Sequence, residues 1–536
     1  MSDDPRAGTV DGLLRRSARR APDRVALTFA DRSWTYRQLD EAVSRAAGHL
    51  LGLGLRPGDR VAAYGRNSDA YAIAFLACVR AGLVHVPVNH ALTGEELRYL
   101  LGQSGTRAVL TDPALAPEVE RVRDGLAVEH VLPLREDPAG PPEAATPGTG
   151  RTGTGATGTG STGTGLLEAA SAGPVPELGT GPADTELAQL LCTSGTTSRP
   201  KGAMMPHRAL VHAYLSAIHA LDLRADDRPL ICMPLYHSAA LHVFLLPYLA
   251  VGAFVLLLES PDIPELLRRI EGERIGSLFL APTVWVPLAN HPDLDRHDLS
   301  SLRKAQYGAS IMPVAVLDRL RARYPQVGFY NCFGQSEIGP LSTVLRPEEH
   351  LDRPASCGRP VLFVETRVVD RNGTDVPPGT PGEVVYRSPQ LCLGYWDSPE
   401  QTAEAFKDGW FHSGDLAVTD EAGYLTVVDR IKDVINTGGV LVASREVEEA
   451  VYSHPAVAEV AVIGVPDERW IEAVTAFVVL RPGAAAPTEA ELVAHVRSRL
   501  APFKVPKQVR FVTELPRNQS GKLLKRELRA RASGIS

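Results

Sequence analysis

The residues with the clearest capacity for chemistry form a polar segment at 191–202, which reads LCTSGTTSRPKG. Several hydroxyl side chains, a glycine and one lysine occur within nine residues and directly follow an apolar run. Hydroxyl and backbone N–H groups can donate hydrogen bonds to phosphate oxygens, and a lysine adds a point charge. The glycine and lysine spacing of a Walker loop is absent. The segment therefore predicts a phosphate-binding loop of another kind.

Four further segments, far apart in the chain, carry other groups that suit a nucleotide. The carboxylate of Asp415 lies on a predicted turn, where it can accept hydrogen bonds from a ribose diol. An aromatic ring, a hydroxyl group and the carboxylate of Glu337 follow a predicted strand. Lys522 lies on a loop near the C-terminus. The segments are NCFGQSE at 331–337, GWFHSGD at 409–415, DRIKD at 429–433 and LPRNQSGK at 515–522.

In this order the segments resemble the adenylate-forming superfamily, which includes acyl-CoA synthetases, peptide-synthetase adenylation domains and firefly luciferase. The resemblance runs from Thr35 to Arg529. The segments at 307–310, 388–396 and 443–448 look most similar to bacterial fatty-acyl-CoA synthetases. The resemblance implies an ATP-dependent acyl-CoA ligase that activates a hydrophobic carboxylic acid as acyl-AMP and transfers it to coenzyme A. ATP, Mg²⁺ and coenzyme A would be its cofactors and partners.

The resemblance also implies which residues meet each ligand. The acid would lie beside His237, Tyr307 and Gly308, and Mg²⁺ would bind Glu337 and Thr196. Coenzyme A would meet Gly438, Gly439 and Arg445. ATP and AMP would bind Thr193, Ser194, Gly195, Thr196, Thr197, Lys201, Gly308, Ala309, Ser310, Asn331, Cys332, Phe333, Gly334, Ser336, Asp415, Arg430 and Lys522.

This reaction explains why a joint between two domains would be needed. A carboxylate attacks the α-phosphorus of ATP poorly because both are anionic, so the site must align them and neutralise charge. By resemblance, Lys522 bridges the carboxylate and the α-phosphate. A small domain then rotates about a hinge matching Lys432, which brings the thiol-guiding glycines to the site. The catalytic residues implied are Lys522, Lys201, Arg430 and His237.

Three positions depart from the family pattern. Ser198 stands at a usual glycine, the common Glu-Asn pair is missing after Gly439, and Ile471 replaces a common glycine. Where such a glycine has a positive φ, another residue costs on the order of 1 kcal/mol. An enzyme competent mainly in thioesterifying an adenylate made elsewhere is therefore an alternative. Others are a free-standing enzyme that loads a carrier protein, a luciferase-like oxygenase and a non-catalytic nucleotide-binding relative.

The arrangement of apolar runs indicates an α/β fold. Short strand-like runs such as 60–64, 84–88 and 108–111 alternate with helical patterns, which is typical of a parallel sheet flanked by helices. After Cys357 the chain becomes β-rich. We expect a large N-terminal domain over 1–430, built from α/β subdomains and a β-rich subdomain. A small, mobile α+β C-terminal domain would occupy 431–536.

A stretch of different composition interrupts the N-terminal domain. Residues 148–165 are almost only glycine and threonine, with too little apolar surface to offset the entropy of ordering. Two GxGxxG matches fall inside this repeat, whereas a dinucleotide fingerprint must follow a strand and open a helix. The sequence predicts a flexible insert over 136–184.

The composition narrows the classes of partner that the protein could bind. The 536 residues carry a formal net charge of −7 and no basic stripe, which disfavours nucleic acid. No apolar run predicts stable membrane insertion, and the N-terminus has no signal peptide. Six scattered cysteines form no Cys-x-x-Cys pair, which favours the cytoplasm over a disulfide-forming compartment. The oligomeric state is not readable from the sequence.

Overall fold

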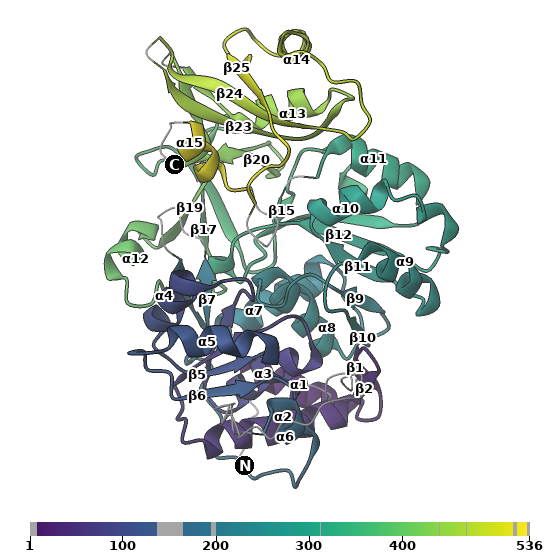
Figure 1. Ribbon diagram of the computed structural model, residues 1–536, viewed down its shortest axis with the longest axis vertical. Helices are drawn as coiled ribbons and strands as arrows, with labels where there is room; N and C mark the ends of the chain where they lie inside the picture. The colour runs from purple at the N-terminus through teal and green to yellow at the C-terminus, as the bar shows by residue number, and fades with distance from the viewer. Residues whose placement is uncertain are drawn as a thin grey trace, which may run out of the picture.

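The computed structural model describes residues 8–136, 164–193, 200–310, 312–438, 440–467, 469–517 and 523–532. Within these residues the strands form four sheets, which helices cover (Figure 1). Three sheets belong to the larger N-terminal part. The fourth forms the smaller C-terminal unit, drawn in green to yellow at the top of Figure 1. The predicted α/β class, with a large first domain and a small last one, is confirmed.

The first sheet is six-stranded and carries the ends of the predicted phosphate loop. Its order is β6-β5-β3-β4-β7-β8, and its pairs are parallel except β7 with β8. The parallel neighbours are joined through helices, as such crossovers require. The strands are β3 (Arg60–Tyr64), β4 (Val84–Val88), β5 (Thr106–Thr111), β6 (His130–Pro133), β7 (Leu187–Thr193) and β8 (Lys201–Pro206). The helices are α3 (Asp69–Arg80), α4 (Gly94–Ser104), η1 (Pro113–Leu115) and α5 (Ala116–Val122).

Helices α2 (Tyr36–Gly52) and α3 form the packed centre of this first unit. Thr35 and Gln38 make a reciprocal capping box that starts α2, and the Ser68 hydroxyl accepts from Tyr71 N to start α3. Every residue of α3 is buried, because this helix is largely apolar on all sides.

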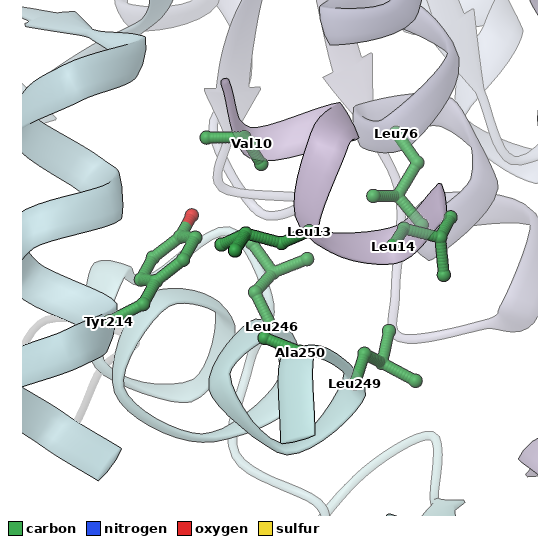
Figure 2. A pocket seen from close by; sticks show the side chains of 8 residues that line it. All are labelled: Val10, Leu13, Leu14, Leu76, Tyr214, Leu246, Leu249 and Ala250. Carbon is green, nitrogen blue, oxygen red and sulfur yellow. The ribbon is translucent and has the colours of Figure 1, made fainter. Parts of the chain in front are cut away.

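The N-terminal helix α1 (Val10–Arg20) closes this core from outside. Its apolar side packs on α8 (Leu246–Val251) around a gap of about 10 Å³, which Leu13, Leu246 and Tyr214 help to line (Figure 2). That volume holds at most one water molecule. The gap is therefore a packing imperfection between two helices and not a substrate pocket.

The second sheet is nine-stranded and supplies the edge at which two of the predicted motifs end. Its order is β15-β14-β13-β12-β11-β9-β10-β1-β2, and its inner strands are parallel. The strands are β1 (Val25–Phe29), β2 (Arg32–Thr35), β9 (Pro229–Ile231), β10 (Val255–Leu257), β11 (Ser277–Leu280), β12 (Lys304–Gly308), β13 (Gly328–Phe333), β14 (Thr343–Leu345) and β15 (Arg359–Pro360). The helical segments are α7 (His207–Ala220), the π-helix η2 (Ala239–Leu245), α9 (Ile263–Gly272), α10 (Pro282–Ala289), η3 (Leu294–Arg296), α11 (Val314–Arg323), η4 (Ser336–Ile338) and η5 (Pro347–Glu349).

The third sheet is antiparallel and leads into the small C-terminal unit. Strand β19 lies between β17 and β18 and also pairs with β20. The strands are β16 (Glu365–Val369), β17 (Gly382–Arg387), β18 (Phe406–Lys407), β19 (Trp410–Thr419) and β20 (Leu425–Arg430), with helix α12 (Pro399–Ala405) beside them. This is the β-rich texture expected after Cys357.

The C-terminal unit has its own sheet and its own apolar clusters. A single turn of helix, η6 (Ile431–Asp433), joins β20 to the first strand of the C-terminal unit. Among the residues that the structure describes, buried valines from β22, β23 and β24 pack against α13 and α14 in a cluster drawn from this unit alone. The elements are β21 (Ile435–Thr437), β22 (Val440–Val442), β23 (Val457–Asp467), β24 (Ile471–Leu480), β25 (Gln508–Phe511), α13 (Ser444–Tyr452), α14 (Glu489–Arg497) and α15 (Lys525–Ala532).

The predicted insert is shorter than the sequence suggests. Residues 137–163 lie outside the described residues, but a helix, α6 (Leu166–Ser171), follows them. Leu166, Leu167 and Ala170 are buried against α2 and α3. The prediction of a flexible insert over 136–184 is therefore wrong for the residues of α6. The small apolar cluster in LLEAAS was too short to stand out beside the Gly/Thr repeat.

A further property concerns membrane-spanning helices. None of the helices in the described ranges is long and apolar enough to cross a bilayer. Leu241 and its neighbours, the most apolar run of the chain, lie in η2 and α8 and are buried in the main core.

Candidate active site

Strands β12 and β13 end side by side and form the floor of the candidate site. They are parallel neighbours, and Gly308 pairs with Cys332 at their carboxyl ends. Ligands of open α/β sheets bind at this edge. The predicted segments 307–310 and 331–337 therefore meet, although they are far apart in sequence.

Two glycines let the backbones approach closely here. A Cβ atom on Gly308 would lie 2.3 Å from the Cys332 carbonyl oxygen, and one on Gly334 would lie 2.0 Å from that of Pro340. Both contacts are far inside van der Waals distance, so only glycine fits. Ala309 has a φ of 64°, a conformation that L-residues rarely adopt. Ala309 and Ser310 are exposed on this edge, where a flat ring could lie against the backbone.

A buried carboxylate stands on the third sheet beside this edge. Asp415 is 2% exposed, and its Oδ1 accepts from Arg430 Nε at 2.5 Å. Its Oδ2 accepts from the amide nitrogen of Gln335 at 2.6 Å, and the same nitrogen donates to the Ser413 carbonyl. Gln335 thereby joins the segment after β13 to the strand that carries Asp415. The structure brings three predicted motifs together at this point.

The predicted metal ligand is oriented by an aromatic residue. The Tyr395 hydroxyl donates to Glu337 Oε1 at 3.0 Å. Lys201 Nζ lies 4.8 Å from the centre of the Tyr395 ring, within cation–π range. Burial, with the nearby Glu337 charge, raises the pKa of Tyr395, so its hydroxyl keeps its proton and donates. One carboxylate and one cation thus both lie against Tyr395, the first at its hydroxyl and the second over its ring.

The first sheet delivers Lys201 to this place. Thr193 and Lys201 are directly paired residues of β7 and β8, at the two ends of the predicted phosphate loop. The 393–396 segment continues beside β8, with Trp396 N donating to the Gly202 carbonyl and Met204 N donating to the Gly394 carbonyl. Lys201 and Tyr395 are therefore held by backbone pairing rather than by side chains alone.

His237 reaches the same edge from the segment before η2. Its neighbour Ser238 lies 2.9 Å from Ser336, hydroxyl to hydroxyl, and Ser336 directly precedes Glu337. Ala239 N donates to His237 Nδ1 at 3.4 Å. His237 is partly exposed.

The residues present fit a magnesium ion that arrives with a nucleotide. Mg²⁺ is commonly bound by one or two carboxylates together with substrate phosphates. Glu337 offers one carboxylate, which Tyr395 holds through Oε1, close to the cation at Lys201. Among the described residues there is no group of three acidic, histidine or cysteine side chains that could hold a metal by itself.

The side chains of some predicted residues make their contacts away from this part of the site. Tyr307 packs in the apolar cluster of α9–α11, and its hydroxyl lies 3.0 Å from Nε2 of the buried His350. The amide nitrogen of Asn331 donates to the Ser356 carbonyl. Cys332 is buried, and burial raises the pKa of its thiol. Phe333 ends β13 and is partly buried against the main core.

Other predicted residues belong to the C-terminal unit or lie outside the described ranges. Gly438 has a φ of 63°, and its N donates to the Trp470 carbonyl. Arg445 donates to the Val427 carbonyl of β20 at 2.5 Å, and Lys432 is exposed in η6. The predicted residues outside the described ranges are Ser194, Gly195, Thr196, Thr197, Gly439 and Lys522, together with Ser198.

Sequence reasoning missed the parts that Gln335 and Tyr395 play. Both stand inside motifs that were noticed, but their types carry no signature of their own. Gln335 matters because its amide spans two sheets, and Tyr395 because it lies between Lys201 and Glu337. Such roles follow only from distances.

Known proteins resemble this chain along nearly its whole length. The sequence matches the AMP-binding enzyme family over residues 14–396 and the AMP-binding enzyme C-terminal domain over residues 446–522. It is 38% identical to a feruloyl-CoA synthase of an Amycolatopsis species, covering 96% of this chain and 97% of that protein. It is 35% identical to a long-chain-fatty-acid–CoA ligase of Escherichia coli, covering 97% and 94%. The crystal structure of the anthranilate CoA ligase AuaEII with anthranoyl-AMP superposes with a TM-score of 0.88 and 27% identity, covering 99% and 98%.

Proposed function

We propose that this chain, which belongs to the AMP-binding enzyme family and is an ATP-dependent acyl-CoA ligase, activates a hydrophobic carboxylic acid as an acyl-adenylate. The observation that carries the proposal is that the short segment 335–337 contacts two groups of charged residues. Gln335 bonds to Asp415, which pairs with Arg430, and Glu337 bonds to Tyr395, whose ring lies beside Lys201. This arrangement offers one group of suitable charge to each part of MgATP. The acyl group then passes to the thiol of coenzyme A.

The ribose and the base would lie on the Asp415 side of the site. Arg430 and Gln335 fix the Asp415 carboxylate, and a carboxylate has enough lone pairs to accept from the ribose hydroxyls as well. Phe333 would stack on adenine, with the backbone of Gly308, Ala309 and Ser310 on the other side. The close approach of the Gly308 and Cys332 backbones supports this, because a flat base needs an unobstructed backbone surface.

The phosphates would lie on the Lys201 side. Lys201, with Thr193 and the hydroxyl residues Ser194, Thr196 and Thr197, would hold the β- and γ-phosphates. Glu337 would bind the Mg²⁺ ion, which when bound neutralises charge on the departing pyrophosphate. Ser336 would lie near the α-phosphate, since it neighbours both Glu337 and Ser238.

The first half-reaction joins the acid to the α-phosphorus. An acid carboxylate oxygen attacks, the bond from the α-phosphorus to the bridging oxygen breaks, and pyrophosphate leaves. His237 would orient the carboxylate, and Lys522 would neutralise both anions. Arg430 would support the developing charge from the ribose side.

The second half-reaction uses the small domain. The thiol attacks the acyl carbon, and AMP leaves with the oxygen that the acid supplied. We place the division between the domains at residues 430 and 431, with Lys432 as the hinge. Gly438, Gly439 and Arg445 would then guide the pantetheine arm. Each of these assignments is supported by position along the chain and by the family to which it belongs.

The acid is proposed to be hydrophobic, and aromatic acids are the first class to examine. Phe244 in η2, the helix that follows His237, stacks on Phe279 in β11 with ring centres 4.3 Å apart. Both rings are buried in the main core. The feruloyl-CoA synthase and the fatty-acid ligase among the relatives act on apolar acids by name. We also propose a cytoplasmic location, supported by six cysteines that are all free thiols.

The test supplies purified enzyme with ATP, Mg²⁺, coenzyme A and a panel of aromatic and aliphatic acids. AMP and acyl-CoA, followed by mass spectrometry, should appear together and only with an acid. The Lys201→Ala variant should lose most of this activity. Acyl-CoA formed only from a supplied acyl-adenylate would instead identify an enzyme of the second half-reaction alone. Loading of a carrier protein but not coenzyme A would identify the other alternative.

A further inference from the structure

A set of hydrogen bonds crosses the hinge and ties the small domain to the large one. Asp429 is the residue before Arg430 at the end of β20. Its Oδ2 accepts from both the backbone N and the hydroxyl of Ser444, at 2.6 and 2.7 Å. Ser444 is the first residue of α13, so a carboxylate from the large domain caps a helix of the small domain. Asp429 is 7% exposed and Ser444 is fully buried.

Helix α15 joins the same set from the other end of the small domain. Lys525 Nζ donates to the Ser444 hydroxyl oxygen at 2.6 Å and pairs with Glu448 at 2.8 Å. The side chains of Lys525 and Glu448 are only 13% and 17% exposed. Charge-assisted bonds of this kind, sheltered from water, are among the stronger polar contacts in proteins.

Arg445 adds a second contact across the hinge. It donates to the Val427 carbonyl, two residues before Asp429, at 2.5 Å. Val427 and Asp429 precede Lys432 in the chain, whereas Ser444, Arg445 and Lys525 follow it. A large rotation about Lys432 must separate these partners. We name Asp429, Ser444, Arg445 and Lys525 the hinge latch.

The orientation that the latch holds corresponds to the first half-reaction. The whole chain, both domains included, superposes with a TM-score of 0.87 on the ATP-bound crystal structure of MatB from Rhodopseudomonas palustris, and ATP takes part in the first half-reaction alone. The latch fixes Lys525 beside Asp429, next to the Arg430–Asp415 pair.

We propose that Asp429 and Ser444 are positioning residues that hold the small domain in the orientation for adenylation. The proposal rests on the ligase function proposed above. Arg445 has two roles in this proposal. Its guanidinium contacts Val427 in this orientation, and the same group is assigned to coenzyme A after rotation. Breaking the latch removes support from the first orientation and leaves the second untouched.

The test measures the two half-reactions separately in the full-length enzyme. Adenylation is followed as pyrophosphate release in a single turnover with acid and ATP but no coenzyme A. Thioester formation is followed from presynthesised acyl-adenylate and coenzyme A. Asp429→Asn and Ser444→Ala should each slow adenylation about tenfold and leave thioester formation unchanged or faster. Glu446→Gln, which breaks the Lys504 pair on the same helix but not a contact across the hinge, should change neither.

Two further outcomes overturn the proposal. Equal slowing of both half-reactions in Asp429→Asn and Ser444→Ala would indicate a general structural defect instead of a latch. Unchanged adenylation in both variants would show that these bonds do not hold the orientation. A wild-type enzyme that performs neither half-reaction would remove the ligase assignment itself, and that result is distinct from the other two.

Discussion

Asp415 and Arg430 face each other on the paired strands β19 and β20, with 2.5 Å between the carboxylate Oδ1 and the guanidinium Nε. Arg430 is the last residue before η6 and the small domain. The same arginine therefore fixes the carboxylate assigned to the ribose and begins the joint between domains. In the proposed mechanism, nucleotide binding and domain rotation would share one residue pair.

Replacement of Asp415 tests that pairing. Asp415 is only 2% exposed, and Asp415→Asn removes the charge that pairs with Arg430 and that is proposed to accept from the ribose hydroxyls. Because charged hydrogen bonds of this kind are worth a few kcal/mol, kcat/KM for ATP should fall by roughly a hundredfold. Asp420→Asn, which breaks the exposed pair with Arg353 at the turn between β19 and β20, should leave it unchanged. Equal kinetics for the two variants would contradict the assignment.

A strained turn in the small domain gives a stability prediction. Ile471 has a φ of 66° where a glycine is favoured, since it follows a tight turn in which Asp467 accepts from the N–H groups of Arg469 and Trp470. A β-branched residue in this region costs on the order of 1–2 kcal/mol. Ile471→Gly should raise the free energy of unfolding of the small domain by about 1 kcal/mol, measured by urea unfolding. Ile471→Val keeps the strain and should bring no gain; a gain equal to that of glycine would refute the explanation.

Two buried histidines predict how stability depends on pH. His85 and His242 are joined through the side chain of Gln189, and burial lowers the pKa of each to about 3. The unfolded chain binds these protons near pH 6.5, and the folded chain does not. Their contribution to stability is therefore complete above pH 6.5 and is lost as the pH falls toward 3. Each histidine adds a slope of about 1.4 kcal/mol per pH unit.

The measurement compares slopes rather than absolute stabilities. Urea unfolding of His242→Asn between pH 6 and pH 4 should show a pH dependence smaller by about 1.4 kcal/mol per unit. His219→Asn removes an exposed histidine from α7, the helix that also carries Tyr214, whose hydroxyl contacts His242. It should keep the wild-type slope. A wild-type slope in His242→Asn would show that this histidine does not stay neutral in the fold.

The ends of the insert predict that most of it is dispensable. Leu167 N donates to the Leu134 carbonyl, and Glu136 N donates to the Glu168 carboxylate, so the flanking segments are already tied together. Deletion of residues 137–163 should leave ligase activity within about twofold and the unfolding midpoint unchanged or slightly raised, because a shorter loop closes at lower entropic cost.

A longer deletion serves as the control for that variant. Removing 137–171 also takes away α6, whose buried Leu166 and Leu167 fill space against the main core. That variant should unfold at clearly lower urea concentration. Loss of cooperative unfolding in the shorter deletion would mean that the insert supports the fold.

Much of the fold was predictable because apolar runs and turns are local signals. The predicted strands 60–64 and 84–88 coincide with β3 and β4, since short Val/Ala runs bounded by turns are typical of buried parallel strands. The two-part architecture also follows from the local change in strand and turn pattern along the chain. Helix α6 was missed because six residues beside a Gly/Thr repeat give no helical period.

The site was predictable only as a set of motifs, not as contacts. The contact of the Tyr307 hydroxyl with His350 could not be predicted, because the direction of a side chain on a buried strand depends on register. The capping of Ser444 by Asp429 joins residues on either side of a hinge, and no local pattern announces it. Long-range polar contacts of this kind require coordinates.

The measurement that tests the central claim most directly follows oxygen atoms from the acid. With an acid labelled with ¹⁸O in both carboxylate positions, the ligase should transfer one labelled oxygen to AMP and keep the other in the thioester. This outcome requires the carboxylate to attack the α-phosphorus and the thiol to displace AMP. AMP without ¹⁸O, formed alongside labelled acyl-CoA, would contradict an acyl-adenylate intermediate and with it the proposed ligase mechanism.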